Sequence, residues 1–298
     1  MKKVFTSADQ IDFNPQDLPE MPLPQRVLMV EPTYFNVEYV INPHMIGQAG
    51  TVNFDRAQQE WEQLANRFQK LGLDVIQLAG IPGLPDMVFS ANQSLPYIDE
   101  NGRRKVIMSI MHTDQRAREV GHIEKWYHKN GYEVYHLDPE KVDDFEGMGD
   151  AIWHFKRNLL WGGYGFRTSR KAYEQISKIF DIPVILLELT DERFYHLDTC
   201  FCSLDENSVL IYPDAFNEAG LEMIYKVYDR VIEAPAEEAI NLFAVNATCP
   251  DGLNVLIQEG CKAVNRKLKD HGFTVHEIST REFLKSGGSV YCIKMLLW

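Results

Sequence analysis

The sequence lacks the features that mark secreted, membrane-spanning and nucleic-acid-binding proteins. Its most apolar run, "IPVILLEL" at 182–189, is far too short to cross a bilayer, and no apolar segment follows the two N-terminal lysines as in a signal peptide. The five cysteines are odd in number and include no CxxC pair, which argues against a disulfide framework. The net charge is −13 without a basic cluster, so neither nucleic acid nor an anionic membrane is an expected partner. We therefore expect a cytoplasmic protein.

Nucleotide-binding motifs are absent as well. No glycine-rich phosphate loop follows any predicted strand, and "GGYG" at 162–165 lies within a predicted hairpin. The composition, with 45% hydrophobic and 24% charged residues, is typical of a globular protein. The acidic net charge favours a small cationic ligand.

The sequence does contain an internal repeat of a helix followed by a strand. Apolar residues recur at helical spacing before a short apolar strand in five segments, which are 54–78, 114–137, 169–189, 217–234 and 260–278. Gly72, Gly131 and Gly272 stand where a helix C-cap is expected. Paired alternating runs that read as hairpins lie between these segments, at 86–98 with 104–111, 150–155 with 159–165, 200–205 with 208–213 and 242–249 with 253–260.

The repeating unit is therefore hairpin, helix, strand. A run of βαβ units is also compatible with a doubly wound sheet, but five equivalent units with hairpins favour a closed ring. We predict an α/β fold, a five-bladed α/β propeller, in a single domain over 26–298. The Pro-rich residues 1–25 are predicted to form an N-terminal arm that lies across it.

Polar side chains follow the last strand of each repeat at comparable positions. Because equivalent positions of a pseudo-five-fold ring meet at its axis, they are expected to gather in one cavity; these residues are Asp86, Asn92, Glu146, Asp150, His196, Asp198, Asn246 and Cys292. A cysteine, a histidine and carboxylates together suit nucleophilic catalysis, since the thiolate attacks and a positioned base or acid moves protons. Additional carboxylates suit a guanidinium, which offers paired donors.

The stretch "RFYHLDTCFC" at 193–202 also contains possible zinc ligands. If the stretch is one strand, His196, Cys200 and Cys202 face the same side. Strand neighbours two apart lie about 7 Å from one another, so three ligands on a straight strand hardly converge on one ion. We therefore expect no metal, with Cys200 and Cys202 as packed thiols.

Several motifs resemble those of the guanidine-modifying superfamily. They are "EPTYFNVEYVINPHM" at 31–45, "PDMVFSAN" at 85–92, "FEGMGDA" at 145–151, "GYGFRTS" at 163–169, "FYHLDTCF" at 194–201 and the terminal "GGSVYC" at 287–292. The superfamily includes amidinotransferases, arginine deiminases, dimethylarginine dimethylaminohydrolases and arginine dihydrolases. The match runs from about residue 26 to the end, and the superfamily's five-bladed propeller agrees with the repeat.

The resemblance implies a role for each matching residue. Cys292 is implied as the nucleophile that attacks the guanidino carbon to form an S-thiouronium intermediate. His196 is implied as the acid and base, and Asp150 as the carboxylate that grips the guanidinium. Arg167 is implied to bind a substrate carboxylate. Supporting or substrate-binding roles are implied for Glu146, Asp198, Asp86 and Asn246, although Asp86 is equally readable as a turn residue. A cysteine beside an apolar strand is more often an inert core residue, and only the "GGS" before it and its repeat position favour catalysis.

Two departures from the superfamily's patterns concern the substrate. Asn92 stands where deiminases usually have an aspartate, and "FSAN" resembles the "FTAN" of arginine dihydrolase-like proteins. Ile110 stands where relatives often have an arginine that binds the substrate carboxylate. The first hypothesis is therefore a hydrolase acting on the guanidino group of arginine or a derivative.

Three alternatives stay open. They are an amidinotransferase, a dimethylarginine-type hydrolase and an inactive binding module. None of these mechanisms needs a cofactor or a metal. The expected partner is a small cationic guanidino substrate, and a homo-oligomer is compatible with the sequence.

Overall fold

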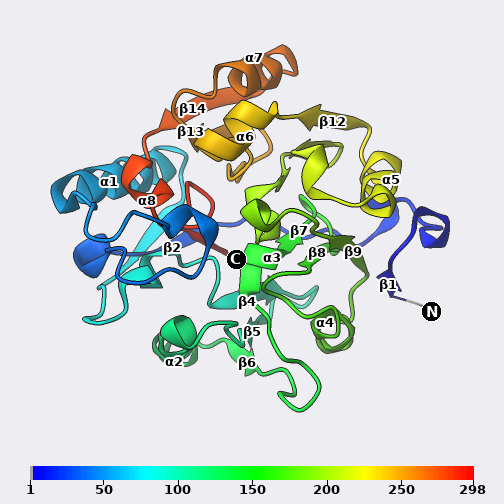
Figure 1. Ribbon diagram of the computed structural model, residues 1–298. Coiled ribbons are helices and arrows are strands. Elements are labelled where there is room, and N and C mark those ends of the chain that lie inside the picture. The colour runs from blue at the N-terminus through cyan, green and yellow to red at the C-terminus, as the bar shows by residue number, and fades with distance from the viewer. Residues whose placement is uncertain (1–2) are drawn as a thin grey trace.

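Five small sheets surround a common centre in the part of the chain that is described, residues 3–298 of a computed structural model (Figure 1). The sheets run β15-β2-β3, β4-β5-β6, β7-β8-β9-β1, β10-β11-β12 and β13-β14. The strands of the first two are β15 (Met295–Leu297), β2 (Arg26–Val30), β3 (Asp74–Leu78), β4 (Ser94–Ile98), β5 (Arg104–Met108) and β6 (Glu133–Tyr135). Those of the other three are β7 (Ala151–Trp153), β8 (Leu160–Tyr164), β9 (Val184–Glu188), β1 (Val4–Phe5), β10 (Phe201–Ser203), β11 (Ser208–Ile211), β12 (Arg230–Glu233), β13 (Asn254–Gln258) and β14 (Thr274–Ile278).

One helix connects the two parallel strands of each sheet and covers its outer side (Figure 1). These helices are α1 (Phe54–Lys70), α2 (Asp114–Lys129), α4 (Ala172–Phe180), α5 (Glu218–Val227) and α7 (Lys262–Asp270). Three shorter helices, α3 (Gly147–Asp150), α6 (Ala236–Leu242) and α8 (Arg281–Leu284), lie in the connections between sheets. The predicted unit of hairpin, helix and strand is thus confirmed in the three sheets that contain β4–β6, β7–β9 and β10–β12, and the fold is a mixed α/β arrangement of small sheets.

The local sequence accounts for the ends of these helices. The side chain of Asn53 accepts a hydrogen bond from the amide of Arg56 and caps α1. Past the helix ends, Gly72, Gly131 and Gly272 have φ values of 88°, 74° and 89°, a left-handed conformation that glycine adopts without strain. These are the three positions at which the sequence predicts a C-cap.

The ring is closed by pairing between the two ends of the domain. Strand β15 pairs antiparallel with β2, with Met295 opposite Leu28 and Leu297 opposite Arg26. This pairing anchors the chain three residues after Cys292 and holds that cysteine at the inner end of the first sheet.

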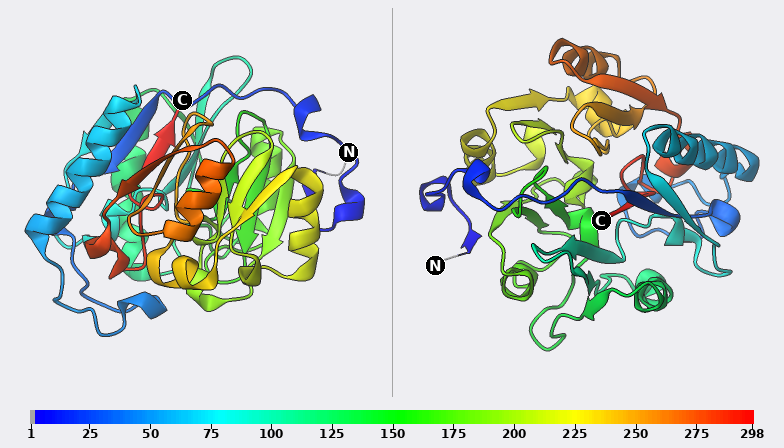
Figure 2. Two further views of the ribbon diagram at one scale, coloured as in Figure 1. Left: turned by 90° about the horizontal axis from the view of Figure 1, so that it is seen from above. Right: turned by 180° about the vertical axis from the view of Figure 1, so that it is seen from behind.

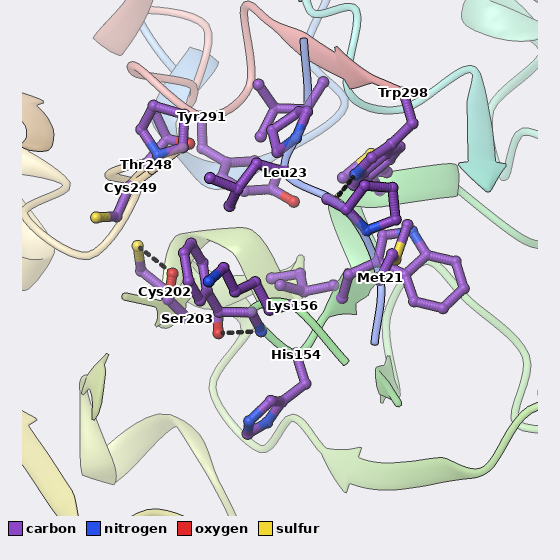
Figure 3. Close-up of a pocket in the computed structure, with 18 residues that line it drawn as sticks. Met21, Leu23, His154, Lys156, Cys202, Ser203, Thr248, Cys249, Tyr291 and Trp298 are labelled. Carbon is purple, nitrogen blue, oxygen red and sulfur yellow. Dashed lines mark hydrogen bonds between the residues drawn. The ribbon is translucent and has the colours of Figure 1, made fainter. Parts of the chain in front are cut away.

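The predicted arm covers residues 1–25. Part of it crosses the face of the ring that lies at the back in Figure 1 and is seen from behind in Figure 2. Residues 1 and 2 lie outside the described residues. Strand β1 adds to the edge of β9, and the segment 21–24 covers a cavity of about 560 Å³ empty volume on that face. Figure 3 shows this cavity, which is lined by side chains from four of the five sheets and their connections, among them Cys202 and Tyr291.

Two local predictions differ from the structure. The stretch 193–202 is not one strand, because Leu197–Thr199 forms a 3-10 turn and β10 begins only at Phe201. The hydroxyl of Thr199 donates a 2.6 Å hydrogen bond to the carbonyl of His196, which stabilises this turn. In the last repeat, the first strand of the expected hairpin is reduced to one bridge between Thr248 and Leu256. Within residues 3–298, no helix is long and apolar enough to span a membrane.

Candidate active site

The predicted site residues lie in the connections that lead from the outer strand of one sheet to the inner strand of the next, except Arg167, which lies between β8 and α4. They surround a small pocket that is only partly enclosed. Five of them line it directly, namely Asp86, Asn92, Arg167, His196 and Cys292. The other four, Glu146, Asp150, Asp198 and Asn246, contact these residues from behind.

The thiol of Cys292 is held by two side chains. Its Sγ donates a hydrogen bond to Asp198 Oδ2 at 3.2 Å and accepts one from Asn246 Nδ2 at 3.1 Å. Burial and the neighbouring Asp198 raise the pKa of the Cys292 thiol well above its usual value. Burial likewise raises the pKa of Asp198 to about 7, although the hydrogen bond from Cys292 acts in the opposite direction. The resting sulfur is therefore a thiol whose proton faces a carboxylate.

Asn246 also holds the loop that carries the cysteine. Its Oδ1 accepts hydrogen bonds from the backbone amides of Ser289, Tyr291 and Cys292 at 3.0, 3.1 and 3.3 Å. Its Nδ2 donates to the carbonyl of Asp198 as well as to the sulfur. The buried side-chain amide of Asn246 thus fixes the positions of both Cys292 and Asp198, which are joined by the hydrogen bond of the thiol.

We expect Asn246→Asp to fold but to lose activity. The carboxylate can accept from the same three amides, so the loop keeps its shape. The donor to Sγ is lost and a second negative charge is added beside the sulfur, which disfavours the thiolate; losing one such contact costs about tenfold to a hundredfold in kcat/KM. Steady-state kinetics and thermal melting separate the two effects. Full activity in a stable Asn246→Asp protein contradicts the assigned role.

His196 is oriented by Glu146. The imidazole Nε2 lies 2.6 Å from Glu146 Oε2, and because the carboxylate only accepts, Nε2 carries the hydrogen. Glu146 also accepts from Arg167 Nη1 at 3.2 Å and from the amide of His112 at 3.0 Å. Burial alone would raise the pKa of Glu146, but its hydrogen bond with His196 and the charges of His196 and Arg167 outweigh it and lower that pKa to about 2. Glu146 therefore stays ionised and accepts the hydrogen bond from Nε2.

Asp150 lies close to the same histidine but is fully engaged by the protein. Its Oδ2 is 4.0 Å from His196 Nε2 and accepts a hydrogen bond from Thr168 Oγ1 at 2.7 Å. Its Oδ1 accepts from the amide of Leu197 at 3.0 Å. Burial raises the pKa of Asp150 to about 6. This carboxylate is oriented before any ligand arrives, as a guanidinium-binding group needs to be.

Asn92 is oriented by an arginine that the sequence patterns did not single out. Arg116 Nη1 donates to Asn92 Oδ1 at 2.8 Å, while its other nitrogens bond to Glu119 and to the carbonyls of Asp86 and Phe89. The i, i+3 pair of Arg116 and Glu119 on α2 resembles a surface ion pair in the sequence, yet both side chains are buried. Because Asn92 Oδ1 is occupied, only its Nδ2, which has no partner among the described residues, is left for a ligand.

Two further predictions concern the binding of a substrate carboxylate. Arg167 lies over the ring of Tyr195 at 4.8 Å and donates to the carbonyl of Ile41 at 2.6 Å. Ile110 forms a backbone bridge with Phe145, and its side chain cannot replace an arginine as a partner of a carboxylate. Arg167 and Arg116 are thus the cations that line the pocket in the described chain.

A loop that the sequence analysis did not connect with the site covers the pocket. Asn42 donates to the carbonyl of Ser286 at 3.0 Å, and the hydroxyl of Tyr195 donates to the carbonyl of Gly287 at 2.6 Å. Ser286 in turn donates to Asp86 Oδ1 at 3.0 Å, so Asp86 lies in the pocket wall rather than in an exposed turn. These contacts fasten the segment around Asn42 over the cysteine loop.

The described residues contain no cluster of histidine, cysteine and carboxylate groups suited to hold a metal ion. Cys200 and Cys202 instead donate to the carbonyls of Leu197 and Ala247, at 3.5 and 3.2 Å. Both are buried thiols, as expected from the sequence.

Small sheets around a common centre, with a cysteine, a histidine and carboxylates gathered there, indicate a guanidine-modifying protein. The sequence profile described as N,N dimethylarginine dimethylhydrolase, eukaryotic, matches residues 32–297, and the chain belongs to this family.

The curated relatives include an enzyme named an arginine dihydrolase and one named a dimethylarginine dimethylaminohydrolase. The bifunctional arginine dihydrolase/ornithine cyclodeaminase ArgZ of Synechocystis sp. is 36% identical over 274 residues, which are 91% of this chain and 37% of ArgZ. The N(G),N(G)-dimethylarginine dimethylaminohydrolase of Mycobacterium tuberculosis is 35% identical over 271 residues, which are 91% of this chain and 85% of that protein. The chain therefore spans little more than a third of ArgZ.

Solved structures agree with this family. The crystal structure of the N-terminal domain of ArgZ bound to its product matches with a TM-score of 0.84 at 35% identity, over 92% of this chain and 97% of that chain. A further structure of that domain is covalently bound to a reaction intermediate.

Proposed function

We propose that the protein is a hydrolase that cleaves C–N bonds of a guanidino group through a covalent intermediate on Cys292. The observation that carries this proposal is the pairing of Cys292 with Asp198 and of His196 with Glu146 around one pocket. A nucleophile and an acid–base group, each oriented by a carboxylate, are what two successive proton-coupled displacements require.

The sequence of bond changes follows from this arrangement. Sγ attacks the guanidino carbon after losing its proton, and His196 gives a proton to the nitrogen that leaves as ammonia or an amine. The neutral imidazole then accepts a proton from water, the water oxygen bonds to the same carbon, and the S–C bond breaks. Asp150 holds the guanidinium nitrogens throughout, and Asp86 forms the opposite wall of the pocket.

Arginine is the substrate we propose first, with ornithine as the product. Arginine and two waters then give ornithine, two ammonia and carbon dioxide, which requires a ureido intermediate to be bound and attacked in the same pocket. The free Nδ2 of Asn92 supports this, because a donor suits the ureido oxygen whereas a carboxylate would suit only a cation. ArgZ, the relative named an arginine dihydrolase, supports it too.

A dimethylarginine hydrolase is the second candidate. The description of the family and the relative from Mycobacterium tuberculosis favour it. This reaction releases dimethylamine and stops at citrulline, so the two candidates differ in both products.

A direct assay distinguishes these functions. The protein is incubated with arginine, methylated arginines and agmatine, with and without an amine acceptor, and products are identified by mass spectrometry. Ornithine and ammonia from arginine support the dihydrolase, and citrulline and dimethylamine from dimethylarginine support the alternative. Transfer of the amidino group to the added amine would instead identify an amidinotransferase.

We propose a reducing, cytoplasmic setting for this reaction. The five cysteines are free and buried, and one of them must remain a thiol to act as the nucleophile. The substrate is a small cation, in keeping with the net charge of −13.

Replacing Asn92 with aspartate is expected to change the products more than the stability. Arg116, at 2.8 Å, compensates the new charge, so the melting temperature should change little. The donor to the ureido oxygen is lost, so citrulline should accumulate from arginine at the expense of ornithine. The ratio of the two products measures the effect. An unchanged ratio together with a large loss of stability would make Asn92 a structural residue.

A further inference from the structure

Lys294 is completely buried and has no hydrogen-bond partner for its ammonium. Its exposed fraction is 0%, and no described residue accepts a hydrogen bond from Nζ. The nitrogen lies 3.1 Å from the centre of the Tyr291 ring. Burying an unpaired ammonium is costly, and nothing in the proposed steps above uses it. Because burying this ammonium costs free energy, we expect Lys294, which follows Cys292 by two residues, to have a function.

Among the described residues, no carboxylate oxygen lies within 4.0 Å of Lys294 Nζ, but the charges that act on it over a longer distance include those of the proposed nucleophile and its partner. Its electrostatic interactions are with Asp198, Cys202 and Cys292, the largest of them with Asp198. Asp198 uses Oδ2 for the thiol and leaves Oδ1 without a partner among the described residues. Other titratable or charged side chains that interact with Asp198 or Cys292 are Tyr195, Tyr291, Cys200 and Arg116.

The charges of this cluster balance only when Lys294 is counted. Cys292 and Asp198 share one proton and therefore one negative charge, located on either the carboxylate or the sulfur. Burial lowers the pKa of Lys294 to about 7, and the charge of Asp198 opposes that decrease. A protonated Lys294 thus makes the buried set neutral wherever the shared proton lies, so moving it from Sγ to Asp198 leaves the net charge unchanged.

We propose that Lys294 is a positioning residue that supplies the buried positive charge for the negative charge shared by Asp198 and Cys292. The inference rests on the proposed role of Cys292 as the nucleophile. With the cation in place, the thiolate forms by a short proton transfer to Asp198. Without it, the negative charge of the pair is unbalanced in an apolar environment, so the pair takes up a second proton and the sulfur stays protonated.

The test follows the thiolate itself and needs no substrate. Ultraviolet thiolate absorbance is recorded against pH for the wild type, Lys294→Met, Lys294→Gln and Tyr291→Phe, each minus the same protein carrying Cys292→Ser. Both neutral substitutions should raise the midpoint of the thiolate titration by at least about one pH unit. Below the midpoint, this shift lowers the thiolate population at least about tenfold. Tyr291→Phe removes another unpartnered buried polar atom at the same place without changing any charge, so its midpoint should equal that of the wild type.

The thiolate midpoint separates this role from a merely structural one. Both neutral substitutions remove the cation that balances the shared negative charge, so they should lower the melting temperature, and kcat/KM should fall with the thiolate population. A midpoint in both neutral variants that matches the wild type would overturn the proposal, whatever their stability. Because the absorbance is independent of turnover, a shifted midpoint in a protein that hydrolyses no guanidine would remove the proposed function and keep this inference.

Discussion

Replacing Cys292 with serine should reduce turnover by about a thousandfold or more while the fold is preserved. A hydroxyl can donate to Asp198 and accept from Asn246 as the thiol does, so the local hydrogen bonds survive. It does not become an anion near neutral pH, and the attack on the guanidino carbon is lost. Steady-state kinetics on the substrate found in the panel, with thermal melting alongside, provide the measurement.

Cys202→Ser is the matched control for this substitution. Cys202 is also buried and donates to a backbone carbonyl, that of Ala247, which a serine hydroxyl can still reach. The control should keep nearly all activity. Retained activity in Cys292→Ser, or an equal loss in both variants, would remove Cys292 from the mechanism.

Replacing His196 with glycine should also lower turnover, by about a hundredfold to ten-thousandfold. The imidazole is the proposed source of the proton for the leaving nitrogen and the acceptor of the proton from water, so both steps slow. Glu146 is left buried without its main partner, which also lowers the stability.

A substitution at the nearby His112 is the control for removing an imidazole ring. His112 donates to Glu146 through its backbone amide, while its side chain bonds to Asp144 and is largely exposed. His112→Gln should therefore leave turnover close to that of the wild type. If His196→Gly and His112→Gln behave alike, His196 does not have the proposed role.

The architecture could be predicted because the repeat is visible in the sequence. Glycines at helix ends and alternating runs with turn residues are local signals, and the structure contains both at the expected places except for the first strand of the last hairpin. The stretch 193–202 alternates as a strand would, but the hydrogen bond from Thr199 to the carbonyl of His196 stabilises a 3-10 turn there. A side chain that hydrogen-bonds to the nearby backbone, in place of the hydrogen bonds of a regular strand, is hard to recognise from the sequence alone.

The site was predictable only in part. Position in the repeat and resemblance to known motifs identified Cys292 and His196, which the structure places on one pocket. Arg116 was missed because its charge pattern with Glu119 is that of an exposed helix face, and its burial depends on the packing of α2 against the loop at 85–92. Lys294 was missed for a related reason, since a lysine beside an apolar strand is normally at the surface.

A covalent adduct on Cys292 tests the central claim most directly. The wild type and His196→Gly are mixed with the substrate, quenched rapidly, and analysed by intact mass and peptide mapping. The account predicts an added mass equal to the thiouronium fragment, located on Cys292, which persists longer in His196→Gly because water is no longer activated. Turnover by the wild type with no adduct in either protein, or with the adduct on another residue, would contradict it.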